Sequence, residues 1–211
     1  VAEMVSAGAN ERVTVIVLQD SSGRSDSRLL RIRSGRYEVL DEPGEYDMGD
    51  WRTLRDFGVS TVQRFPARHY ALVIWNHGDG WRSPQPARAP LKGFSNDDHG
   101  TLDGISISNG DYGRALAAIS AAAGGKLDLV GFDACLMGMY EVAKASAPYA
   151  HWFVASSELE PAGGWAYDRF LPRLISNPTL GAEALGTAIV DTYYAADPEN
   201  ATLALTDLDS V

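Results

Sequence analysis

The sequence contains a single cysteine, Cys135, and no run of about 18 consecutive apolar residues. One cysteine excludes an internal disulfide and any metal site built from several cysteines. The start also lacks the charged and apolar regions of a signal peptide. Both ends stop beside strand-like patterns, so we expect residues 1–211 to be a single domain cut from a longer protein.

Positive charge is scarce as well. The chain has 18 Lys and Arg against 28 Asp and Glu, a formal net charge of −10. Binding of nucleic acid requires a basic surface, and no basic cluster is present, so we expect neither a nucleic acid nor a membrane as partner. No HExxH, Walker or dinucleotide-binding motif is found.

Short apolar runs alternate with helical patterns along the chain. The runs are residues 12–19, 69–76, 127–134, 151–157 and 201–207. Their near-continuous hydrophobicity is typical of parallel strands covered on both faces. Helices are expected at 50–65, 111–122, 138–147, 166–176 and 181–195, and a hairpin at 28–40. The predicted fold class is α/β, with a mostly parallel sheet plus a small antiparallel hairpin.

Two chemically reactive side chains follow two of these expected strands. His77 follows the run 69–76 in "IWNHGDGW", and Cys135 follows the run 127–134 in "GFDACLMGM". Ligands of open parallel sheets collect beyond the carboxyl ends of the strands, so the two side chains are expected at one rim. The residues after Cys135 are expected to begin a helix, a position that favours the thiolate form of cysteine. Each residue alone is more often structural, but together they indicate a nucleophile and its proton carrier.

The segments "VIWNHGDGW" and "GFDACLMGMYEVA" resemble the two signature segments of the clostripain family of cysteine endopeptidases, which are bacterial relatives of caspases. The resemblance implies a caspase-like α/β/α sandwich and a catalytic dyad of Cys135 and His77. It also implies cleavage of proteins or peptides after Arg or Lys, and a secreted or periplasmic location. No cofactor is required in such enzymes, although some depend on calcium.

Several further residues are candidates for substrate binding. Strand periodicity places Asp133 on the same face as Cys135, where its carboxylate can pair with a basic P1 side chain. The alternative is an aspartate that accepts main-chain N–H bonds and braces the loop. The N–H groups of Gly78 and Cys135 are the expected oxyanion donors. Residues expected to line the cleft are Ser156, Ser157 and Glu158.

The segment 82–100 combines three prolines with basic residues and has no apolar periodicity, so an exposed processing loop is expected there. Family members are commonly cut in this position, which makes Lys92 and then Arg88 the expected self-cleavage sites and implies a monomer or a processed two-chain form. In the same segment Asp97 and Asp98 could hold Ca²⁺, with a solvated acidic loop as the alternative.

Two other functions are compatible with the sequence. One is a non-catalytic caspase-like binding domain, and the other is a cysteine-dependent amidase acting on non-peptide substrates. The presence of His77, Cys135 and Asp133 together favours the endopeptidase.

Overall fold

The computed structural model describes residues 1–81, 93–100, 104–198 and 202–211. The elements are, in chain order, α1 (Ala2–Ala7), β1 (Ile16–Gln19), β2 (Ser27–Arg33), β3 (Arg36–Gly44), α2 (Trp51–Arg64), β4 (Ala71–Trp75), α3 (Asp111–Ala123), β5 (Leu127–Asp133), α4 (Tyr140–Ser146), β6 (Ala150–Ser156), α5 (Tyr167–Ser176), α6 (Ala182–Ala196), β7 (Leu203–Asp207) and a final 3₁₀ turn (Leu208–Ser210). Every expected helix is present, with bounds that differ by at most two residues, and α1 was not anticipated.

The central sheet has the strand order β4-β5-β6-β7. β4 and β6 both pair with β5 in parallel, and β7 pairs with β6 in the antiparallel direction. At the carboxyl end of the first pair, Trp75 lies in register with Asp133. The chain therefore leaves β4 and β5 at the same rim of the sheet.

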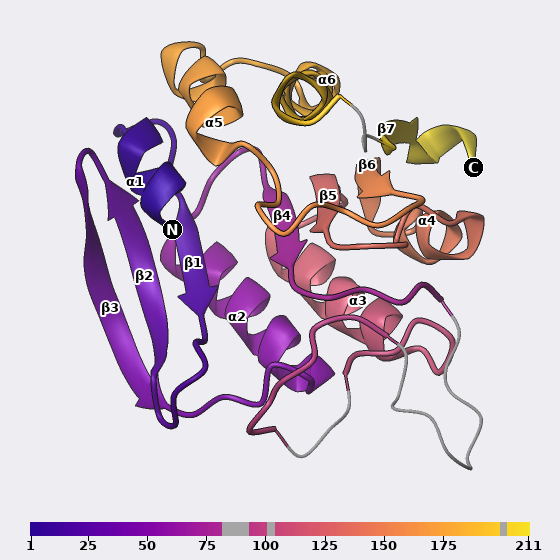
Figure 1. The fold of residues 1–211 in the computed structure, drawn as a ribbon, viewed down its shortest axis with the longest axis horizontal. Coiled ribbons are helices and arrows are strands. Elements are labelled where there is room, and N and C mark those ends of the chain that lie inside the picture. The colour runs from indigo at the N-terminus through magenta and orange to yellow at the C-terminus, as the bar shows by residue number, and fades with distance from the viewer. Residues whose placement is uncertain (82–92, 101–103, 199–201) are drawn as a thin grey trace.

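Helices cover both faces of this sheet, which makes the fold an α/β/α sandwich (Figure 1). Successive residues of a strand point to opposite faces. On β5, Val130 and Phe132 belong to the core shared with α2 and α3, whereas Leu129 belongs to the core shared with α5 and α6. On that second face Trp165 is completely buried and packs directly on Gly131, where a Cβ would collide with the indole.

A second, three-stranded antiparallel sheet has the order β1-β2-β3. The hairpin expected at 28–40 is confirmed, with Gly35 in the left-handed conformation at its turn (φ 72°). The expectation that residues 12–19 and 201–207 form parallel strands is wrong: β1 pairs antiparallel with β2, and β7 pairs antiparallel with β6. Apolar runs show that a strand is buried but not which neighbour it pairs with or in which direction.

The segment 82–100, expected to be an exposed loop, is described only from Gly93 onwards. There Phe94 is completely buried and forms bridges to Gly78 and Ile105. The expectation of exposure is therefore wrong for residues 93–95, because the Phe94 ring packs against Tyr112 and Phe132 in the core, whereas Asn96 and Asp98 are exposed as expected. Among the described helices none is both long and apolar enough to cross a membrane.

Candidate active site

His77 and Cys135 lie on adjacent loops at the rim where β4 and β5 end. Asn76 N–H donates to the carbonyl of Asp133 (3.4 Å), and the two loops then stay in contact. Gly78 packs so closely on the Cys135 carbonyl that a Cβ at residue 78 would collide with it. The structure thus brings the two predicted residues to one place, with His77 exposed and Cys135 half-buried.

The main chain around His77 is held firmly while its ring is left accessible. The His77 carbonyl accepts from Ser95 N–H (3.2 Å), and Asp79 N–H donates to the Gly93 carbonyl (3.0 Å). Within the described part of the chain, the imidazole itself makes no hydrogen bond. A ring held only by its backbone can turn toward a bound substrate or toward the thiol, as catalytic groups of empty sites often must.

The thiol of Cys135 contacts the segment that follows β6. Glu160 N–H donates to Cys135 Sγ at 3.3 Å, and Sγ lies 3.9 Å from the Glu160 carbonyl. The expected helix directly after the cysteine is wrong, because Leu136 adopts a left-handed conformation (φ 59°) and α4 begins only at Tyr140. Among the described residues, no helix therefore begins directly after Cys135.

The two main-chain N–H groups expected to bind an oxyanion, those of Gly78 and Cys135, make no hydrogen bond within the described part of the chain. The next amide, Leu136 N–H, donates to the Glu158 carbonyl (3.0 Å). Free donors beside a nucleophile are the arrangement that stabilises a tetrahedral intermediate.

Asp133 is almost completely buried, at 2% exposed. Its two carboxylate oxygens accept from Trp165 N–H at 3.2 and 3.1 Å, and one also accepts from the Tyr167 hydroxyl at 2.8 Å. The two bonds from Trp165 N–H are those expected if Asp133 stabilises the loop rather than binding substrate. They leave acceptor positions unused, because a carboxylate has about four of them.

Glu160, which the sequence analysis did not single out, shares this buried space with Asp133. Burial, and then the neighbouring Asp133 charge, raises the pKa of Glu160 to about 9. Burial likewise raises the pKa of Asp133 to about 6. Glu160 Oε2 is buried without a hydrogen-bond partner, and among the described residues no Lys or Arg pairs with either acid. We call Asp133 and Glu160 the acid pair.

The three residues expected to line the cleft occupy different environments. Ser156 is completely buried, because its hydroxyl closes the turn after β6 by donating to the Glu158 carbonyl (3.1 Å) and contacts Thr202 Oγ1 (2.6 Å). Its hydroxyl is thus engaged inside the protein, and its expected contact with substrate stays a prediction. Ser157 and Glu158 are exposed at the rim. Within "SELE" only packing decides which glutamate turns inward, and the structure selects Glu160.

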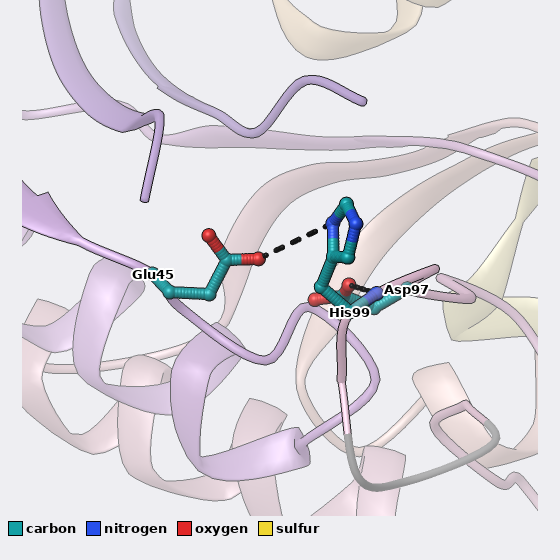
Figure 2. A group of neighbouring side chains, drawn as sticks. All are labelled: Glu45, Asp97 and His99. Atoms are coloured by element: carbon teal, nitrogen blue, oxygen red, sulfur yellow. Dashed lines mark hydrogen bonds and ion pairs between the residues drawn. The ribbon is translucent and has the colours of Figure 1, made fainter. Parts of the chain in front are cut away.

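A separate cluster of possible metal ligands joins the end of β3 to the segment 93–100. Figure 2 shows Glu45, Asp97 and His99 side by side, and Glu45 also belongs to a second group with Asp20 and Asp26. Glu45 Oε1 and His99 Nδ1 are buried without hydrogen-bond partners and lie 3.7 Å apart.

Only one of the two expected calcium ligands belongs to this cluster. Asp97 accepts from Met48 N–H at 2.7 Å and from His99 N–H at 2.8 Å, so it also ties the two segments together. Asp98 is exposed and belongs to neither group.

Comparison with known proteins gives one family. The family model described as the clostripain family matches residues 1–211. Clostripain of Hathewaya histolytica is 31% identical over 170 residues, which is 71% of this chain and 31% of that protein. The chain thus spans about a third of the length of this curated relative.

Solved structures of C11 proteases share the fold. A secreted C11 cysteine protease from Bacteroides thetaiotaomicron, in complex with an irreversible peptide inhibitor, superposes with a TM-score of 0.76 at 22% identity, over 98% of this chain and 60% of that one. An inactive zymogen C11 protease from Parabacteroides distasonis gives 0.68 at 20% identity, over 99% and 55%. These likenesses confirm the caspase-like sandwich expected from the sequence.

Proposed function

Because the chain belongs to the clostripain family, we propose that it is a cysteine endopeptidase that cleaves after arginine or lysine with Cys135 and His77 as its dyad. The observation that carries the specificity is the acid pair. Two carboxyl groups are buried beside the only cysteine, and the described residues supply no cation to balance them. Burying charge without a partner is costly, so such a pair indicates a cationic ligand.

The proposed reaction follows from the order of groups at the rim. His77 takes the thiol proton, and Cys135 Sγ attacks the carbonyl carbon of the scissile bond. The N–H groups of Gly78 and Cys135 bind the oxyanion of the tetrahedral intermediate. His77 then gives its proton to the leaving amine, and a water molecule hydrolyses the resulting thioester.

The acid pair suits a guanidinium particularly well. A guanidinium presents five N–H donors in a plane. Glu160 accepts from Trp165 Nε1 at 3.5 Å and lies within hydrogen-bonding reach of Asp133, so a guanidinium would take over the contact that the two acids now share. The approaching positive charge favours loss of the proton from Glu160. In the complex the guanidinium charge then offsets the negative charge of the acid pair. Since Asp133 is only 2% exposed, the side chain enters after a shift of the residues that cover this aspartate.

Labelling with an arginyl acyloxymethyl ketone tests the proposed function directly. We expect one molecule to attach to Cys135 in the wild-type protein, and a matched reagent with a neutral P1 residue to react much more slowly. Mass spectrometry of the intact protein and of its peptides measures both. If the arginyl reagent does not label Cys135, the protein is a non-catalytic binding domain. If the protein hydrolyses small amides but no peptide, it is an amidase.

Calcium is a second part of the proposal, and the acidic cluster fits it. Two groups that share Glu45, one with Asp97 and His99 and the other with Asp20 and Asp26, contain the hard oxygen ligands that Ca²⁺ prefers. Burial, and then the charges of its neighbours Asp97, Glu45 and Asp26, raises the pKa of Asp20, which shows that the carboxylates repel one another. A bound ion would neutralise them and fasten the segment that pairs with Gly78.

We expect Ca²⁺ to raise the melting temperature of the wild-type protein and not that of the double variant Glu45→Gln, Asp97→Asn. At one hundred times the Kd the stabilisation is about 2.7 kcal/mol, or roughly 5–10 °C for a chain of this size. Glu38→Gln, which changes an exposed glutamate of β3, is the matched control. Equal melting curves with Ca²⁺ and with EDTA would show that the cluster holds no calcium.

Self-processing and secretion complete the proposal. Relatives of this fold are described as a zymogen and as a secreted protease, which supports activation by cleavage and action on extracellular proteins. The expected cleavage sites, Lys92 and Arg88, lie outside the described residues.

A further inference from the structure

Trp75 is a large aromatic residue that the fold leaves exposed. It ends β4 with 64% of its surface accessible, whereas Trp165 on the same face of the sheet is completely buried. Trp75 lies in register with Asp133, and neighbours in register on parallel strands point to the same face. The indole therefore stands at the rim directly beside the buried carboxylate.

Gly164 shows how closely the indole and the carboxylate approach one another. A Cβ placed on Gly164 would lie 2.7 and 2.9 Å from the two carboxylate oxygens of Asp133 and 3.0 Å from Trp75 Nε1. The residue has a left-handed conformation (φ 65°), which disfavours any side chain there. The Asp133 carboxylate and the Nε1 edge of the Trp75 indole therefore both pack against Gly164, which places the two groups next to each other.

Nothing in the described part of the chain uses the face of this indole. Among residues 1–81, 93–100, 104–198 and 202–211, cations stack on Trp51, Phe65 and Tyr140, and none stacks on Trp75. Trp75 also takes no part in the ring pairs of the core. An exposed indole beside a buried acid without a cation is the arrangement that receives a cation from outside.

We propose that Trp75 is a specificity-determining residue whose indole face packs on the P1 guanidinium as it reaches Asp133 and Glu160, so that the enzyme prefers arginine to lysine. This inference rests on the proposed function. A guanidinium can stack flat on an aromatic ring while its edge donates to carboxylates, because it is planar and weakly hydrated. An ammonium group is compact and strongly hydrated, so it gains less from the ring.

The test compares two peptide substrates that differ only in Arg or Lys at P1, with kcat/KM measured for wild type, Trp75→Ala and Trp75→Phe. We expect Trp75→Ala to lower the value for the Arg peptide roughly 2- to 30-fold, the range of cation–π contacts. The Lys peptide should lose less, so the Arg-to-Lys ratio falls. Trp75→Phe should restore part of that ratio. Tyr37→Ala, an exposed aromatic of β3 in the other sheet, is the control and should change neither value.

The outcomes separate this inference from the function on which it rests. An unchanged Arg-to-Lys ratio in Trp75→Ala, with Arg peptides still cleaved, overturns the role of Trp75 and leaves the endopeptidase intact. Failure of the wild type to cleave either peptide overturns both. Iodoacetamide, which needs no P1 contact, should alkylate Cys135 at the same rate in wild type and Trp75→Ala. A slower rate would show that the substitution disturbs the thiol itself and would count against a role in specificity.

Discussion

Cys135→Ala is expected to lower kcat/KM for an Arg peptide by at least about 10⁴-fold, and His77→Ala to do nearly the same. In the proposed mechanism the two side chains act as one unit, because the thiol is the nucleophile and the imidazole removes its proton. The double variant should consequently be little worse than either single variant. Peptide hydrolysis followed by fluorescence measures all three.

The control variant changes a second histidine, His69, which lies at the other end of β4 from His77. His69 precedes β4, whereas His77 follows it. The ring of His69 bonds to Asp128 (2.8 Å), away from the rim, so His69→Ala should keep full activity. Unchanged melting temperatures would show that the dyad variants remain folded. The Cys135→Ala chain should also stay uncut on a denaturing gel if self-processing occurs. Substantial turnover by this variant would refute the cysteine mechanism.

The meeting of His77 and Cys135 could be predicted because it depends on features that short segments carry. Two apolar runs of strand length each end at a polar residue, and parallel pairing brings such ends to one rim. The same reasoning failed for residues 12–19, whose apolar character is satisfied equally well by an antiparallel partner, and they pair with β2 instead.

The rest of the site depends on packing between segments far apart in the sequence. Glu160 turns inward because its main chain is anchored to Cys135 Sγ while Leu159 is left exposed at the surface. The sequence favoured Ser156 and Glu158 because they directly follow a strand. The structure instead uses Ser156 to close a turn, which strand position alone does not indicate.

Asp133→Asn should remove most of the selection for basic residues at P1. Losing one partner of a buried charge pair costs roughly 3–5 kcal/mol, a loss of about 10²- to 5 × 10³-fold in kcat/KM for Arg peptides. Peptides with neutral P1 residues should change far less, because the dyad and the oxyanion donors remain. Asp168→Asn, an exposed aspartate of α5, is the matched control. An unaltered ratio of Arg to neutral substrates would make Asp133 a brace for Trp165 and Tyr167 only.

Glu160→Gln should weaken cleavage after Arg in the same assay, yet it should stabilise the protein without substrate. A residue that only supports the structure would not give this combination, because its loss lowers stability. Burial and the charge of Asp133 raise the pKa of Glu160, and Glu3 of α1 adds a third acid beside Asp133. For an acid whose folded pKa is raised, the favourable contribution is complete below its unfolded pKa and is lost as pH rises through the folded value. The wild type should therefore lose stability between about pH 4.5 and 9. Glutamine never ionises, so its advantage should be absent near pH 4.5 and grow with pH, toward an upper limit of roughly 6 kcal/mol at pH 9 for a pKa raised from 4.5 to about 9. Melting curves at both pH values measure it. If Glu160→Gln is no more stable than wild type at pH 9, ionisation of Glu160 beside Asp133 does not destabilise the protein. The two carboxyl groups then do not form a binding site for a cation.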